Sequence, residues 1–215
     1  MLDRRAVDEY GIPVLLLMEH AGAAVAQTIR QRISAPGARV ICVAGRGHNG
    51  GDGLAAVRLL HGAGMQLEVF VLGTRASLRD EPALYARMVE RLGIPIHELT
   101  RASGWESLQQ SASEATWIID ALLGTGISGP VRPDAERAIR LMNNAGRPIL
   151  AVDTPSGLDV DTGRVSSVAV NATITVTFGL PKQGFFQGEG PRHLGELIVD
   201  AISFPPALLA QVAQS

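Results

Sequence analysis

Three segments of the sequence place polar side chains among glycines, directly after apolar runs. They are residues 45–53 (GRGHNGGDG), 120–130 (DALLGTGISGP) and 153–163 (DTPSGLDVDTG). Glycines let backbone N–H groups approach a phosphate or the edge of a cofactor, and the N-terminus of a following helix favours an anion. Carboxylates beside amide and hydroxyl oxygens suit a hard cation or acid–base catalysis. These segments are therefore the candidates for chemistry.

The first segment contains the spacing G-x-G-x-x-G at Gly45, Gly47 and Gly50, which is typical of dinucleotide-binding loops. The signal is weak by itself, because such a site also has an acidic residue at the end of the next strand, and residues 72–75 (LGTR) contain none. The lysine and hydroxyl residue of a P-loop are missing as well. Asp52 is expected in the first turn of the following helix, either as a cap that offsets the helix dipole or as a ligand contact.

Asp120 and Asp153 each end an apolar run. A carboxylate in that position is unfavourable unless it is hydrogen-bonded, capped or bound to a cation. If the two strands are neighbours, both carboxylates lie on one rim, together with oxygens of Asn49 and Ser156. This set suits a hard cation or acid–base work. The alternative is a glycine-rich turn in which Asp120 is only a structural cap.

Alternating helices and strands are expected to position these residues. Continuous apolar runs at 40–44, 67–72, 117–123 and 149–152 predict strands covered on both faces, and further strands are expected at 94–97, 173–178 and 197–199. Four-residue spacing from Leu17 to Ile29 predicts a helix, as do the patterns at 54–62, 133–146 and 80–92, the last with Asp80 as N-cap. The repeated strand–helix–strand order predicts a single α/β domain over residues 1–215, with a mostly parallel sheet and helices on both faces.

The composition limits the classes of function. The chain has 215 residues, 46% of them hydrophobic, and a net charge of -2, which is not the charge of a nucleic-acid-binding surface. Cys42 is the only cysteine, so an intramolecular disulfide and a multi-cysteine metal site are excluded. No apolar run approaches the roughly 18–20 residues of a membrane span. We therefore expect a cytoplasmic protein with neither a nucleic acid nor a membrane as partner.

Taken together, the segments resemble the YjeF N-terminal domain family, the NAD(P)H-hydrate epimerases. The resemblance rests on residues 17–22 (LMEHAG), 45–53, 120–124 (DALLG), 153–159 (DTPSGLD) and 177–182 (TFGLPK), in the family's order. It implies a Rossmann-like three-layer α-β-α sandwich that forms homodimers. It also implies an isomerase of nicotinamide-nucleotide repair, which interconverts the R and S epimers of hydrated NADH or NADPH and supplies the S epimer to a separate dehydratase.

The resemblance also implies roles for individual residues. Asn49, Asp120 and Ser156 would hold one potassium ion per subunit. The hydrated nucleotide would be bound by His48, Asn49, Gly50, Gly51 and Asp52, by Gly124, Thr125, Gly126, Ile127, Ser128, Gly129 and Pro130, and by Asp153. The sequence departs from the family at His20 and His48, where the family usually has asparagine. Each change adds bulk and a titratable group.

Asp153 and Lys182 are the predicted catalytic residues. The reacting carbon of the hydrate carries a hydroxyl next to the ring nitrogen, and it epimerises either by losing and re-adding hydroxide or by ring opening and reclosure. Either route needs an acid–base group, and Asp153 is the prediction because Asp120 is expected at the potassium. Lys182 is the single lysine among 19 basic residues. It follows a strand, where a compact ammonium can approach a phosphate or a developing oxyanion.

Two other interpretations stay open. One is a non-catalytic nucleotide- or RNA-binding scaffold, since the fold also resembles the YjeF-like domain of RNA-decapping scaffold proteins. The other is a generic NAD-dependent oxidoreductase, against which the missing ribose-binding acid argues. The preference between NADH hydrate and NADPH hydrate is also open, with Arg75 as a candidate for contact with a 2′-phosphate. The amphipathic N-terminal helix is the candidate dimer surface.

Overall fold

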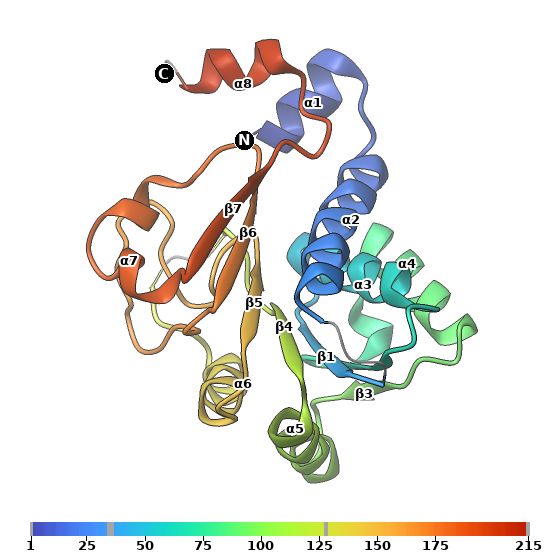
Figure 1. Cartoon of the computed structure of the whole chain (residues 1–215). Helices are drawn as coiled ribbons and strands as arrows, with labels where there is room; N and C mark the ends of the chain where they lie inside the picture. Colours follow the sequence, from blue (N-terminus) through green and yellow to red (C-terminus); the bar gives the residue numbers. More distant parts are fainter. Residues whose placement is uncertain (1, 34–36, 127–128, 214–215) are drawn as a thin grey trace.

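Seven strands form one sheet in which every neighbouring pair runs parallel (Figure 1). The computed structural model describes residues 2–33, 37–126 and 129–213. The strand order is β3-β2-β1-β4-β5-β6-β7. The strands are β1 Arg39–Ala44, β2 Gln66–Val71, β3 Ile96–Glu98, β4 Trp117–Ala121, β5 Ile149–Val152, β6 Ile174–Phe178 and β7 Glu196–Asp200. The order reverses between β1 and β4, and in such sheets a ligand crevice opens beyond the carboxyl ends of the strands at this point.

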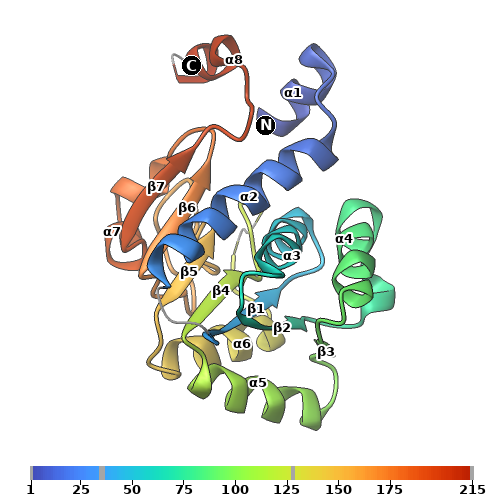
Figure 2. The ribbon, with the colours of Figure 1, turned by 45° about the vertical axis from the view of Figure 1, so that its right-hand side comes forward.

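Helices cover both faces of the sheet, as the sequence predicts (Figure 2). One face carries α2 Val14–Arg32, α3 His48–Leu60 and α4 Asp80–Arg91. The other carries α5 Ala102–Glu114 and α6 Pro133–Asn144. Near the carboxyl edge, α1 Leu2–Tyr10 lies beside α8 Pro206–Ala213 (Figure 1). Short helical turns occur at α7 Gly190–His193, η1 Arg75–Ser77 and η2 Gln183–Phe186.

The two-sided burial explains why the strands read as continuous apolar runs. In β1, Val40, Cys42 and Ala44 belong to the core under α2, α3 and α4. Ile41 and Val43 belong to the core under α5 and α6. All five are fully buried, so neither set of alternate positions tolerates a polar side chain. The strands predicted at 40–44, 117–123 and 149–152 are confirmed for this reason, whereas β3 and β7 are only partly buried.

Helix α3 begins at His48, six positions before the apolar pattern at Leu54, so residues 48–53 are helical rather than part of a loop. Glycine disfavours a helix, and its presence here is explained by the close approach of α3 to neighbouring elements. A Cβ on Gly53 would lie 2.4 Å from the Cβ of Ala121 and 2.9 Å from the Sγ of Cys42. The helix therefore rests directly on β1 and β4, and its first turn is held over the carboxyl end of β4.

Two other expectations differ from the structure. The N-cap of α4 is Arg79 rather than Asp80, which is the first helical residue, with φ 49° and no side-chain capping bond to the helix. Helices α1 and α5 were not expected, because α1 buries only Ala6, and the four buried residues of α5 include a serine. Over the described residues, no helix is both long and apolar enough to cross a membrane.

Gly53→Ala is expected to reduce the free energy of unfolding by about 1–3 kcal/mol, because the new methyl group forces α3 away from β1 and β4. Urea denaturation followed by circular dichroism measures the loss. Gly47→Ala is the matched control, since a Cβ at that position meets nothing within 4 Å. Its loss should stay below about 1 kcal/mol. Equal losses in the two variants would contradict the close-packing explanation.

Candidate functional site

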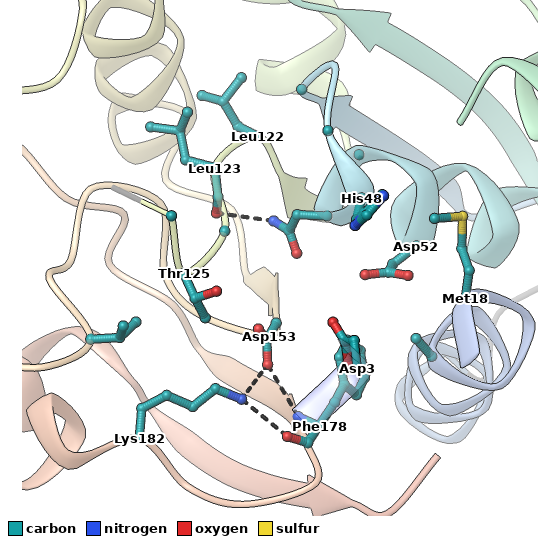
Figure 3. A pocket seen from close by; sticks show the side chains of 18 of the residues that line it. Asp3, Met18, His48, Asp52, Leu122, Leu123, Thr125, Asp153, Phe178 and Lys182 are labelled. Atoms are coloured by element: carbon teal, nitrogen blue, oxygen red, sulfur yellow. Dashed lines mark hydrogen bonds and ion pairs between the residues drawn. The ribbon is translucent and has the colours of Figure 1, made fainter. Parts of the chain in front are cut away.

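A pocket of about 1500 Å³ lies along the carboxyl edge of the sheet (Figure 3). It extends from Leu72 and Gly73 after β2, past the segments after β1, β4 and β5, to Lys182 after β6. Residues from α1 and α2 and from the chain after β7 complete its wall. The pocket therefore lies at the carboxyl edge of the sheet, where the strand order and the glycine-rich segments predict a ligand site.

The structure brings most of the predicted nucleotide-binding residues to this pocket. Gly51 is the exception within α3, because it packs against α2, where an added Cβ would lie 2.5 Å from the Sδ of Met18. Gly129 is exposed and is not part of the lining, and Ile127 and Ser128 lie outside the described residues. The lining includes His48, Asn49, Gly50, Asp52, Gly124, Thr125, Gly126, Pro130, Asp153 and Lys182.

Asp120 lies below the pocket, fully buried at the end of β4. Its Oδ1 accepts hydrogen bonds from the N–H of Leu122 at 3.2 Å and from the Oγ of Ser156 at 2.6 Å. Its Oδ2 accepts one from the N–H of Ser156 at 2.8 Å. Burial raises the pKa of Asp120 to about 6, while the hydrogen bonds from Ser156 and Leu122 oppose that rise. The carboxylate thus joins the loop after β4 to the loop after β5.

Asn49 reaches the same place from α3. Its Nδ2 donates to the carbonyl of Leu123 at 3.0 Å, and the N–H of Leu123 donates to the Oγ of Ser156 at 2.8 Å. Its Oδ1 is buried and has no hydrogen-bond partner among the residues that the structure describes. An orphaned buried oxygen near one carboxylate and a hydroxyl fits a monovalent cation with oxygen ligands. No cluster of three or more His, Cys, Asp or Glu side chains suited to a metal ion occurs in the described ranges.

Asp153 and Lys182 form an ion pair in the pocket wall (Figure 3). The Nζ of Lys182 donates to Asp153 Oδ1 at 2.5 Å, to Thr177 Oγ1 at 2.7 Å and to the carbonyl of Phe178 at 3.1 Å. The Oγ1 of Thr177 and the N–H of Phe178 also donate to Oδ1, whereas Oδ2 has no partner within the described part of the chain. The backbone of Asp153 is left-handed, with φ 62°, a conformation that aspartate tolerates better than most residues. One carboxylate oxygen is thus fixed and the other is free.

Two further carboxyl groups, those of Asp52 and Asp3, face the same space (Figure 3). Asp52 is not a helix cap, because the N-cap of α3 is Gly47 and no acidic residue lies in its first turn. Burial raises the pKa of Asp52 well above its usual value, and the negative charges of Asp153 and Asp3 add to the rise. Sequence reasoning missed Asp3 because it lies on α1, a nine-residue helix that was not predicted.

The arginine expected to contact a ligand from the end of β2 does not line the pocket. Arg75 forms ion pairs with Glu90 and, at 3.4 Å, with Glu98, and it does not line the pocket. Arg46, inside the glycine-rich loop, does line it. The loop itself was a signal for Arg46, since its glycines mark a place where the backbone can approach a ligand.

Comparisons with known proteins agree on one family. Residues 14–184 match the family described as YjeF-related protein N-terminus. An NAD(P)H-hydrate epimerase from Limosilactobacillus fermentum is 39% identical over 197 residues, which are 92% of this chain and 90% of that protein. A bifunctional NAD(P)H-hydrate repair enzyme from Thermofilum pendens is 40% identical over 210 residues, which are 97% of this chain but only 40% of that protein. The chain therefore spans less than half the length of its bifunctional relatives.

A solved structure shows the same fold. The yeast protein YNL200c superimposes with a TM-score of 0.83, over 98% of this chain and 88% of that one. The two sequences are 24% identical, so this likeness concerns the fold alone. It agrees with the three-layer arrangement around a parallel sheet.

The buried charge of Asp120 is expected to make stability depend on pH. Its pKa is about 6 in the folded protein and about 3.9 when unfolded, so the folded state holds the proton more tightly. The stabilisation is complete below about pH 4 and is lost as the pH rises through 6. In a buffer free of potassium and sodium, the unfolding free energy of the wild type, taken relative to Asp120→Asn, should fall by about 2 kcal/mol between pH 4 and 7. Chemical denaturation across this range measures it, and a difference that stays constant with pH would contradict the assignment.

Proposed function

The chain belongs to the family of YjeF-related protein N-termini, and from this premise we propose that it interconverts the R and S epimers of hydrated NADH and NADPH. The observation that carries the proposal is the free Oδ2 of Asp153 in a pocket large enough for a dinucleotide. The match to the Limosilactobacillus epimerase over nine-tenths of that protein supports it. The activity belongs to the isomerases and serves the repair of damaged cofactor.

Asp153 acts as the acid–base group in this proposal. In the ring-opening route, its carboxylate takes the proton of the hydroxyl, the bond from carbon to ring nitrogen breaks with its electrons on nitrogen, and the nitrogen is protonated. Rotation about the adjacent bond and reclosure then present the other face of the carbonyl. Lys182 and Thr177 hold Oδ1, so Oδ2 is presented to the substrate in one orientation.

Asp52 supplies the complementary acid. Burial and the nearby carboxylates raise its pKa and so favour its protonated form, which can donate a proton to the hydroxyl or to the ring nitrogen. In the alternative route the protonated hydroxyl leaves as water, and water returns to the opposite face of the ring. Both routes need an acid and a base in the same pocket. Asp52 provides the acid and Asp153 the base.

We also propose that Asn49, Asp120 and Ser156 hold a potassium ion. The orphaned Oδ1 of Asn49 supports this proposal. The ligand set also supports it, because it combines one carboxylate with neutral amide and hydroxyl oxygens rather than several carboxylates. The ion would supply positive charge beneath the pocket floor, close to bound phosphates. Magnesium suits this set less well, because it prefers more charged ligands and several waters.

A homodimer in the cytoplasm, with a separate S-specific dehydratase as functional partner, completes the proposal. Exposed apolar side chains of Tyr10, Leu15 and Leu16 on α1 and α2 support the N-terminal helices as the dimer surface. The bifunctional name of the longer relatives supports a coupled second activity. Sedimentation equilibrium would measure the number of subunits.

The activity is tested with a mixture of R and S hydrated NADH, to which an S-specific dehydratase is added. Complete consumption of the mixture is expected. Consumption that stalls at the uncatalysed rate once the S epimer is used would point to a non-catalytic scaffold. Hydride transfer to a panel of ketones would instead identify an oxidoreductase.

Asp153→Asn is expected to lower kcat by about 100-fold or more, because the amide cannot accept the proton. The coupled assay measures the rate, and thermal unfolding confirms that the variant is folded. Asp161→Asn is the matched control, since it removes one negative charge from the pocket rim without touching Asp153. Full activity in Asp153→Asn would overturn the assignment. In Lys182→Arg the rate should also fall, and an unchanged rate would show that the ammonium has no special role.

Potassium is expected to raise the melting temperature by a few degrees, corresponding to about 1–3 kcal/mol at a concentration well above its dissociation constant. Differential scanning fluorimetry in potassium chloride, compared with tetramethylammonium chloride of the same ionic strength, measures the shift. Asn49→Ala should lose the shift, because it removes the orphaned oxygen. The same shift in wild type and variant would show that the ion binds elsewhere or acts only through ionic strength.

A further inference from the structure

The pocket has chemically different ends. Its β6 side carries the Asp153–Lys182 pair, where the reaction is proposed. The carboxyl groups of Asp3 and Asp52 face the same space, so the one ammonium on this side is surrounded by carboxyl groups and is already paired with Asp153 (Figure 3). Its β2 side carries Arg46, Leu72 and Gly73. A phosphate-rich part of a ligand is therefore favoured on the β2 side.

The register of the sheet places Arg46 next to Gly73. Ala44 at the end of β1 pairs with Val71 at the end of β2, so the two residues that follow each strand also run side by side. A Cβ built on Gly73 would lie 3.4 Å from the Cδ of Arg46 and 3.9 Å from its Nε. Gly73 has φ 101°, a conformation that disfavours any other residue. The aliphatic part of the Arg46 side chain therefore passes over Gly73, just after the end of β2.

The guanidinium of Arg46 is available to a ligand. Arg46 is exposed, and its side chain makes no hydrogen bond or ion pair with the parts of the chain that the structure describes. Arg75, also near the end of β2, is in contrast held by Glu90 and Glu98. Arg132 is the other arginine of the lining, but it lies after β4, at the start of α6 and next to Asp134.

We propose that Arg46 binds the 2′-phosphate on the adenosine half of NADPH hydrate, and that the protein prefers this substrate to NADH hydrate. In sheets with this strand order the ribose 2′ position lies at the end of β2, where an acidic residue selects the free hydroxyl and an arginine accepts a phosphate. Residues 72–75 (LGTR) contain no acid, and the pocket has a free guanidinium at that point. The inference rests on the proposed function for the nicotinamide half, but the contact itself involves only the adenosine half.

A binding experiment tests the contact without any turnover. Calorimetry compares adenosine 2′,5′-bisphosphate with AMP, two probes that differ only in the 2′-phosphate. The wild type should bind the bisphosphate about 10–100-fold more tightly, as expected for charge-assisted bonds from one guanidinium. Arg46→Gln should reduce this ratio to about threefold or less, while Arg75→Gln, with the same loss of charge outside the pocket, should keep it. A wild type that does not distinguish the probes, including by binding neither, overturns the inference.

Kinetics with both hydrates separates this inference from the proposed function. In Arg46→Gln the loss of kcat/KM with NADPH hydrate should exceed the loss with NADH hydrate by tenfold or more. Equal losses would place Arg46 at a part common to both substrates, and an altered ratio in Arg132→Gln alone would move the contact to α6. Either result overturns the assignment to Arg46. Wild type that discriminates between the probes but epimerises neither hydrate would overturn the proposed function alone.

Discussion

The buried carboxylate of Asp120 is the constraint on which the site depends. A charge at the end of a covered strand is unfavourable by several kcal/mol unless it is fully hydrogen-bonded. Its bonds to Ser156 and Leu122 bring the loops after β4 and β5 together beneath the pocket. The bond from Asn49 to Leu123 then fixes the first turn of α3 to the same point. Asp120, which never reaches the pocket surface, thus holds two loops that are distant in the sequence, and Asn49 joins α3 to one of them.

The strands could be predicted because burial on both faces leaves a simple signature in the sequence. That Asp120 and Asp153 lie at the same edge of the sheet also followed, since β4 and β5 are parallel neighbours, but Asp120 is buried beneath the pocket and only Asp153 lines it. The start of α3 did not follow, because three glycines oppose a helix by propensity alone. They are helical because Gly53 lets α3 contact β1 and β4, and that gain belongs to tertiary packing. Helix α1 is nine residues long and buries only Ala6, so its apolar pattern is too short to have predicted a helix from the sequence.

The choice of partners within the site could not be predicted. Arg46 and Arg75 both follow strands of the same half of the sheet, and the sequence alone favoured Arg75. The difference lies in Glu90 and Glu98, which come from α4 and β3 and neutralise Arg75 outside the pocket. Lys182 is the converse case. As the single lysine it was singled out by composition, and its four-residue separation from Phe178 lets it turn back onto Asp153.

The two histidines that replace the family's usual asparagines act on different parts of the pocket. His48 lies in the lining itself, at the first residue of α3. His20 lies on α2, where its Nδ1 is 2.5 Å from the Oγ of Ser203. Ile202 and Ser203 both have left-handed backbones, with φ 39° and 73°, and Ile202 and Phe204 form part of the pocket wall. This strained turn needs an anchor to persist, so in the proposed complex His20 would act on the nucleotide through the shape of the wall, whereas His48 would act by contact.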